Sequence, residues 1–279
     1  MSRIIVAYAP AGAGKSSFAQ STINPIWYAE LDPGSFERSR KSKLVQLHQY
    51  DLPMTSLEDF GFVDLSMKAN SEKGAAQIVH EYHGWTEVFV GQFVKDYLAW
   101  LKDPSTPNGV IDTYSILTEM VINNFRQRVQ EARRRDPKMS NDASDRLNRL
   151  EYEEVNTQHG QLLQGAKRQG KTLVCVCHQG DRWENGVNTN TPKPDGWKGL
   201  EGAADVVLRF RIENKQPVAY IDKAGGCHLA MLGMKLVAPT LDYVNQLIDS
   251  AAYLNDREVD LPATPDDIIE TAEVQRMLS

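Results

Sequence analysis

The chain has few cysteines, no excess of positive charge and no long apolar run. Its net charge of −6 gives no general attraction to nucleic acid, so any contact with DNA would need a local basic patch. No apolar stretch is long enough to span a bilayer and no signal peptide is visible, so we expect a cytoplasmic location. Cys175 and Cys177 alternate along one predicted strand, which suits buried thiols in a reducing compartment. No second ligand pair follows them at metal-site spacing.

Internal repeats and low-complexity tracts are also missing, and 279 residues suit one large domain with appendages. Runs of β-branched residues alternate with helical patterns, which predicts an α/β fold with a mostly parallel sheet flanked by helices. We expect a core over 1–236, with an irregular insertion at 44–83, and a C-terminal helix and acidic tail over 237–279. The predicted strands cover 4–6, 25–30, 62–65, 110–115, 172–177, 205–211 and 218–222. The predicted helices cover 85–101, 116–135, 143–168 and 241–254.

The first predicted strand leads into a glycine-rich stretch, APAGAGKS, that matches a phosphate-binding P-loop except at its first position. Ala9 replaces the usual glycine there, which is tolerable if its φ is negative. The nucleotide-binding residues are expected to be Ala11, Gly12, Ala13, Gly14, Lys15, Ser16 and Ser17. Lys15 would reach the β- and γ-phosphates of ATP, and Ser16 would be a ligand of Mg²⁺. The alternative is a small-residue turn between strand and helix that binds nothing.

Acidic residues follow two other predicted strands. Asp112 ends the strand at 110–115, where a carboxylate would hold Mg²⁺ through water; it could instead cap the helix that follows. Glu30 and Asp32 follow the strand at 25–30, and a carboxylate there could activate the attacking water. We favour Glu30, because Asp32 fits a turn in the sequence LDPG.

Further polar residues end the later strands. Gln179 or His178 could sense the γ-phosphate, unless they are only polar strand ends. Lys223 could stabilise charge on the nucleotide of a neighbouring subunit, or could be an ordinary solvated lysine.

The stretch 180–199 reads as a long loop in which aromatic residues and cations are interleaved, a composition suited to stacking on single-stranded bases. The alternative is that both tryptophans pack back onto the domain. Basic runs at 38–43 and 133–135 are interpreted as solvated surface. The DNA-binding candidates are Arg182, Trp183, Lys193, Trp197 and Lys198.

The order of these parts, from the P-loop through "IDTYS" to "DKAGG", resembles that of the RecA-like P-loop ATPases over roughly 4–226. Within that family it is most similar to the phage-encoded nucleotide-binding branch described as single-strand-annealing or minimal RecA-type recombinases. The resemblance implies an oligomeric ATPase that uses Mg²⁺ and acts on single-stranded DNA in phage-type recombination or replication, inside a bacterial host. It also implies that Glu30 or Asp32 supplies the catalytic carboxylate, Gln179 or His178 the sensor, and Lys223 an intersubunit finger.

Two other functions stay open at this point. A nucleoside or nucleotide kinase would share the P-loop, and Asp32 and the arginines at 133–135 would then serve the acceptor or a lid. A nucleotide-dependent assembly switch would bind ATP with little turnover.

Overall fold

A computed structural model gives the fold of the chain. It describes residues 2–39, 44–50, 72–135, 149–184, 186–225 and 231–255. The predicted strand at 62–65, Cys227 and the acidic tail lie outside these residues, as does most of the basic run at 38–43.

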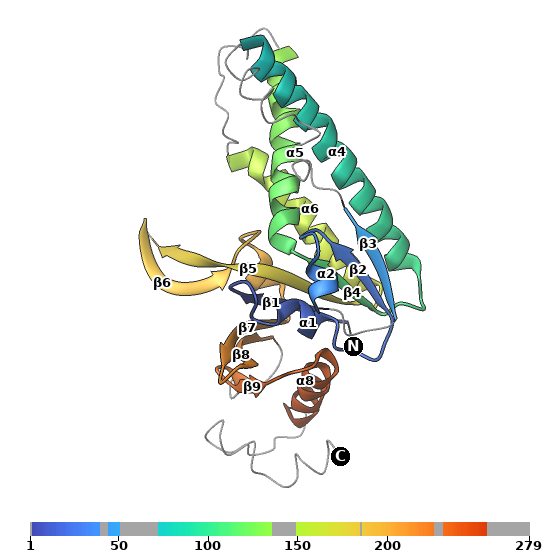
Figure 1. The fold of residues 1–279 in the computed structure, drawn as a ribbon, viewed down its shortest axis with the longest axis vertical. Helices are drawn as coiled ribbons and strands as arrows, with labels where there is room; N and C mark the ends of the chain where they lie inside the picture. Colours follow the sequence, from blue (N-terminus) through green and yellow to red (C-terminus); the bar gives the residue numbers. More distant parts are fainter. Residues whose placement is uncertain are drawn as a thin grey trace.

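The described residues form a nine-stranded sheet in the order β3-β2-β4-β5-β1-β7-β8-β9, with β6 paired to β5 (Figure 1). The strands from β3 to β7 in this order are parallel, whereas β6, β8 and β9 are antiparallel to their partners. The predicted α/β class with a mostly parallel sheet is therefore confirmed. The strands are β1 Ile4–Ala9, β2 Ile26–Glu30, β3 Val45–Gln49, β4 Asn108–Asp112, β5 Thr172–Glu184, β6 Val187–Pro194, β7 Val206–Glu213, β8 Gln216–Ala224 and β9 Lys235–Val237.

The central strands are buried on both faces, which explains the apolar runs in their sequences. Every residue of β1, β2 and β4 is buried. Alternate residues point to opposite faces, so β1 contributes Ile4, Val6 and Tyr8 to one core cluster and Ile5 to the other. Burial on both faces fixes the register of these strands, and their carboxyl ends meet at one edge of the sheet.

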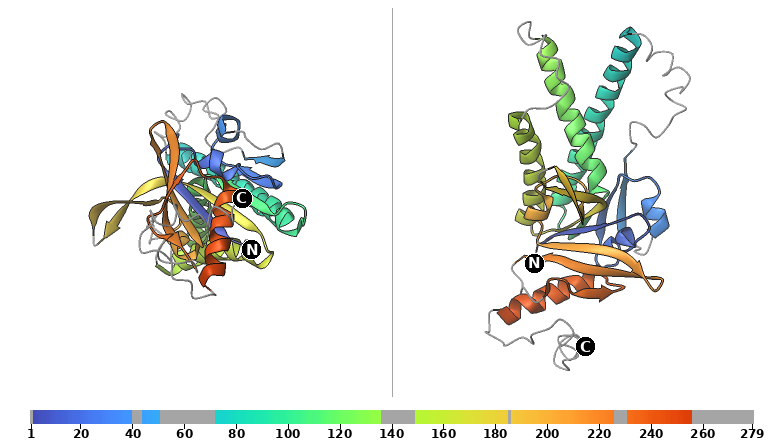
Figure 2. Two further views of the ribbon diagram at one scale, coloured as in Figure 1. Left: turned by 90° about the horizontal axis from the view of Figure 1, so that it is seen from below. Right: turned by 90° about the vertical axis from the view of Figure 1, so that its left-hand side faces the viewer.

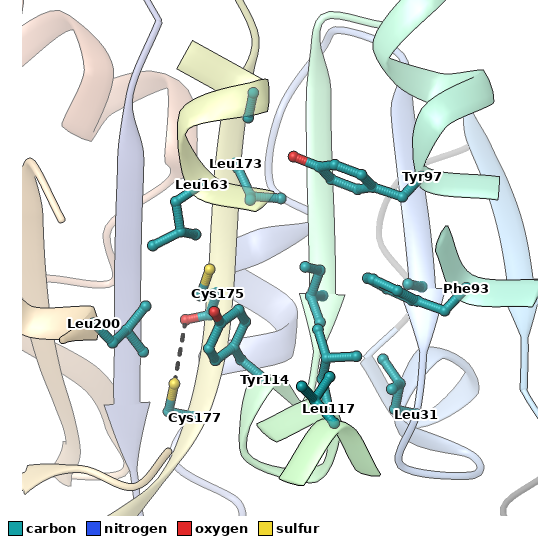
Figure 3. Close-up of a cluster of buried hydrophobic side chains, with 14 of the residues drawn as sticks. Leu31, Phe93, Tyr97, Tyr114, Leu117, Leu163, Leu173, Cys175, Cys177 and Leu200 are labelled. Atoms are coloured by element: carbon teal, nitrogen blue, oxygen red, sulfur yellow. Dashed lines mark hydrogen bonds between the residues drawn. The ribbon is translucent and has the colours of Figure 1, made fainter. Parts of the chain in front are cut away.

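Helices cover both faces of the sheet (Figures 1 and 2). One face is covered by α4, α5 and α6, whose apolar side chains form the first core cluster (Figure 3). The other is covered by α1, α2 and α8, which pack in the second cluster. The helices are α1 Lys15–Ala19, α2 Ser35–Ser39, α4 Glu72–Lys102, α5 Tyr114–Arg135, α6 Arg149–Arg168, α7 Leu200–Ala203 and α8 Leu241–Asn255.

Both cysteines of β5 lie in the first core cluster, as their alternation predicts. Cys175 and Cys177 are fully buried free thiols, and burial raises the pKa of each well above its ordinary value. Burial of this kind disfavours the thiolate that metal binding or nucleophilic chemistry requires, and both side chains pack in the first core cluster.

The contact between α4 and β4 requires a glycine at position 109. The Trp100 ring lies so near Gly109 that an added Cβ would be 2.5 Å from ring atom Cζ2. The same ring stacks on Trp27 with centroids 5.2 Å apart, so it has no room to move away. The Gly109 hydrogen thus lets α4 lie close against β4.

The sequence prediction was wrong for two segments. The stretch 180–199, predicted as a loop, is largely an antiparallel hairpin of β5 and β6 that projects from the sheet (Figure 1). Its Asn, Thr and Pro residues lie on exposed strands, where burial imposes no apolar alternation. The start of the predicted irregular insertion at 44–83 is β3, an edge strand paired to β2, and its last residues belong to α4.

Candidate nucleotide site

A cavity of about 490 Å³ lies at the carboxyl edge of β1, β2 and β4. The P-loop forms one wall, while Asp112 and α2 form the others, so segments far apart in sequence meet here. Open α/β sheets bind ligands at this edge. The lining residues are Ala11, Gly12, Ala13, Gly14, Lys15, Ser16, Ser17, Asp32, Ser35, Arg38, Ser39, Asp112, Thr113 and His178.

The P-loop backbone has the shape of an anion cradle. Gly12 and Gly14 have φ values of +76° and +94°, a region that side chains disfavour. A Cβ on Gly14 would also approach the Pro217 Cβ to 3.0 Å. Ala9 is the last residue of β1 and has no positive φ, so the alanine in place of the usual glycine causes no strain. The loop therefore accommodates the one departure from the P-loop pattern.

Lys15 is the buried cation of the cavity, with 7% of its surface exposed. Its ammonium donates hydrogen bonds of 3.0 Å to the Ala9 carbonyl and 2.9 Å to the Pro10 carbonyl. Burial lowers the pKa of Lys15, and the nearby charge of Asp112 opposes that shift. A bound phosphate would supply the missing negative charge, so the surroundings of Lys15 fit a polyanionic ligand.

Asp112 and Ser16 form the candidate Mg²⁺ position. Asp112 is 1% exposed, and burial raises its pKa, while hydrogen bonds from the Ser16, Tyr28 and Ser35 hydroxyls oppose the shift. Among the described residues no three His, Cys, Asp or Glu side chains gather as a metal cluster. One carboxylate and one hydroxyl suit Mg²⁺, which takes its remaining ligands from phosphates and water.

The buried carboxylate is expected to lower the stability of the protein without nucleotide. Because the folded-state pKa of Asp112 is raised, the folded state holds the proton more tightly, and stability falls as the pH rises past the ordinary Asp pKa. We expect Asp112→Asn to raise the free energy of unfolding at pH 7 by about 1 kcal/mol. Thermal unfolding without nucleotide at pH 5 and pH 8 measures this effect. A variant that melts below the parent at pH 8 would contradict it.

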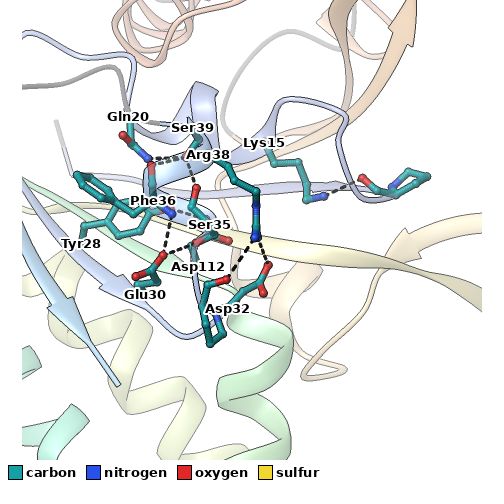
Figure 4. Close-up of polar contacts among 12 residues, drawn as sticks. Lys15, Gln20, Tyr28, Glu30, Asp32, Ser35, Phe36, Arg38, Ser39 and Asp112 are labelled. Atoms are coloured by element: carbon teal, nitrogen blue, oxygen red, sulfur yellow. Dashed lines mark hydrogen bonds and ion pairs between the residues drawn. The ribbon is translucent and has the colours of Figure 1, made fainter. Parts of the chain in front are cut away.

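The two candidate catalytic acids occupy different environments (Figure 4). Glu30 is 3% exposed and is not part of the cavity lining. Its carboxylate accepts hydrogen bonds from the Phe36 amide at 2.8 Å and the Gln49 amide at 2.7 Å, which hold α2 and β3 in place. Asp32 lines the cavity instead. The structure thus brings Asp32, and not the favoured Glu30, to the phosphate-binding loop.

Three residues of α2 also line the cavity: Ser35, and Arg38 and Ser39 from the basic run that the sequence indicated as solvated surface. The Arg38 guanidinium lies 3.3 Å from the Asp32 carboxylate, and Ser35 and Ser39 line the same wall. In the sequence, only their position shortly after a buried strand indicates a site. The basic run at 38–43 is more typical of solvated surface, so the sequence did not predict these residues. They place a cation and two hydroxyls beside the P-loop.

Of the two sensor candidates, His178 lines the cavity, whereas Gln179 is exposed and outside the lining. The His178 backbone N–H donates to the Ser115 hydroxyl at 3.0 Å. The same hydroxyl donates to the Asp195 carbonyl at 2.6 Å. Ser115 thus connects the cavity to the segment that follows β6.

The candidate DNA-binding residues lie on two segments: Arg182, Trp183 and Lys193 on the hairpin of β5 and β6, and Trp197 and Lys198 between β6 and α7. Trp183 is 64% exposed on the hairpin, which also carries Lys193, while the Arg182 guanidinium is bound by the Glu201 carboxylate at 3.0 Å. Trp197 stacks on the buried His159, so this tryptophan packs partly back onto the domain, whereas the neighbouring Lys198 is exposed.

Lys223 lies outside the cavity lining. Its ammonium donates to the Glu201 carbonyl at 2.7 Å and the Gly202 carbonyl at 2.9 Å, both in α7. In this single chain the Lys223 ammonium is therefore bound to the backbone of α7.

No protein-family model matches the chain, and no curated protein sequence matches it. Among solved structures, the chain is similar to the crystal structure of the RadB recombinase, with a TM-score of 0.40. The two are 11% identical over 84% of this chain and 86% of that one. Within the described residues, no helix is both long and apolar enough to cross a membrane.

Proposed function

We propose that this chain is a RecA-like ATPase that binds ATP with Mg²⁺ in the cavity and hydrolyses its β–γ bond. The observation that carries the proposal is the convergence of four chemically distinct parts on one cavity: the P-loop amides, Lys15, the pair of Ser16 and Asp112, and Asp32. A turn that binds nothing would not need these groups together. Positioning and electrostatic stabilisation account for most of the catalysis in such sites.

Each residue then has a definite task. The amides of Gly12 to Lys15 would bind the phosphate oxygens, and the Lys15 ammonium would exchange its carbonyl partners for the β- and γ-phosphates. Ser16 and Asp112 would hold Mg²⁺, which when bound neutralises phosphate charge. Asp32 would accept a proton from the attacking water once Arg38 turns toward the phosphates. His178 would contact the γ-phosphate side of the cavity.

We further propose that the ATPase acts on single-stranded DNA and assembles as a homo-oligomer, as in phage-type recombination or replication. The projecting hairpin supports this proposal, because its exposed Trp183 offers a stacking surface for bases. Lys223, at the end of β8, would act across a subunit interface only after leaving the α7 carbonyls. The division into a core at 1–236 and a C-terminal part at 237–279 remains part of this proposal.

The effect of DNA on ATP hydrolysis tests the proposed function. We expect single-stranded DNA to raise kcat, and ATP to tighten DNA binding in a manner that weakens with added salt. Phosphate release with and without an oligonucleotide measures the first effect, and anisotropy of a labelled strand measures the second. Hydrolysis that is absent under all conditions would favour an assembly switch.

A phosphotransferase is the second candidate, and one observation favours it. Arg38, Ser35 and Ser39 line the wall next to the P-loop, where they could hold the phosphate or hydroxyl of an acceptor. Transfer of labelled γ-phosphate to a nucleoside or nucleotide would establish this activity, whereas release as inorganic phosphate alone favours the ATPase.

A further inference from the structure

A second cavity, of about 720 Å³, lies away from the P-loop, between α5, α6 and the segment that joins β6 to α7. Its volume is in the range of small-molecule sites. The two helices, which rise together from the sheet in Figure 2, each contribute residues one turn apart. From α6 these are Tyr152 and Asn156, and from α5 they are Thr118 and Ile122. The joining segment contributes Trp197 and Lys198.

The aromatic wall of this cavity is held rigidly. The Trp197 ring stacks on the His159 imidazole, with centroids 5.6 Å apart and an angle of 13° between the planes. The His159 Nδ1 atom is in turn 2.8 Å from the Tyr114 hydroxyl. Burial lowers the pKa of His159 to about 4, so the imidazole is neutral at physiological pH. Trp197 is thus a fixed, flat surface on the cavity wall.

The polar groups of the cavity are donors and a cation. Asn156 uses its Oδ1 atom to accept the Trp197 indole N–H at 2.7 Å, which leaves its amide N–H groups. Among the described residues, none pairs with those N–H groups, the Lys198 ammonium or the Tyr152 hydroxyl. None of the described residues that line the cavity carries a carboxylate, although the chain as a whole has a net charge of −6. This corner therefore offers aromatic faces, unused donors and positive charge.

From this combination we infer that the second cavity binds one nucleobase together with its phosphate, as a unit of a single strand or as a free nucleotide. Nucleobases are flat, stack on aromatic rings and carry acceptors that an asparagine amide can reach. The adjoining phosphate matches Lys198 in charge. The single-strand case rests on the proposed function. It differs in placing the contacts with the bases in this cavity and not on the exposed hairpin.

Two substitutions at exposed positions test the inference. Lys198→Gln removes the cation, and Tyr152→Leu removes an aromatic face that is 38% exposed. Two matched controls lie outside the cavity lining: Lys95→Gln on α4 removes one charge, and Tyr243→Leu on α8 removes a tyrosine that is 37% exposed. Binding of a labelled oligo-dT to the full chain with ATP is measured by anisotropy, and dTMP is added as competitor.

Each cavity variant is expected to weaken oligo-dT binding by about tenfold, while both controls and the affinity for ATP stay unchanged. Competition by dTMP would show that a free nucleotide fills the cavity, and its absence would show that the strand is required. Folded cavity variants that bind oligo-dT and dTMP like the parent would overturn the inference, yet leave ATP-dependent DNA binding and the proposed function intact. A parent that hydrolyses no ATP would instead overturn the proposed function.

Discussion

Lys15→Ala is expected to abolish ATP hydrolysis and to weaken ATP binding by roughly 30- to 150-fold, or about 2–3 kcal/mol. Lys15 is buried, with 7% of its surface exposed, so neither water nor another side chain could readily take the place of its ammonium beside a bound phosphate. Isothermal titration with a non-hydrolysable ATP analogue measures the affinity, and phosphate release measures turnover.

The matched control for this variant is Lys95→Ala on α4, which removes an exposed lysine outside the cavity lining. It should bind and hydrolyse ATP like the parent. Unchanged ATP affinity in a folded Lys15→Ala protein would remove the basis of every role assigned around the cavity.

Asp32→Asn is expected to lower kcat by about 10²- to 10⁴-fold with little change in ATP affinity, because an amide cannot accept the proton of the attacking water. Single-turnover hydrolysis at saturating ATP measures the step directly. We expect Asp32 to carry this task because it lines the cavity, whereas Glu30 does not.

Glu30→Gln is the companion variant, and it should act mainly on stability. Its carboxylate holds the Phe36 and Gln49 amides, so the substitution should cost about 1–3 kcal/mol of folding free energy. Its kcat should stay within about tenfold of the parent. Loss of hydrolysis in Glu30→Gln with unchanged stability would assign the base to Glu30 instead.

Much of the fold follows from local sequence. The apolar runs within β1, β4 and β5 are recognisable because strands covered on both faces bury apolar side chains on both sides. The P-loop is recognisable because phosphate binding requires its glycines and its lysine at fixed positions, but the sequence alone does not show whether the backbone at Ala9 is strained. The structure shows that Ala9 is the last residue of β1 and has the extended backbone of a strand, which an alanine adopts without strain.

Other features depend on partners that a sequence does not show. The hairpin of β5 and β6 is exposed, so its pattern matches a loop until the two strands are paired. The choice between Glu30 and Asp32 depends on where the chain turns after β2. In the sequence, Tyr152 and Asn156 show only the spacing of one helical turn. They can be recognised as part of a candidate site only because the fold places Trp197 beside them.

The double role of the Ser115 hydroxyl has a thermodynamic consequence. It accepts from the backbone of a residue in the phosphate cavity and donates to the segment that continues into the second cavity. If the two cavities are linked through this hydroxyl, the linkage must be reciprocal: a ligand at one raises the affinity of the other by the same factor that it receives. The factor is obtained by measuring the affinity of each cavity for its ligand with and without the ligand of the other cavity. Repeating both measurements with Ser115→Ala would show whether the hydroxyl carries the linkage.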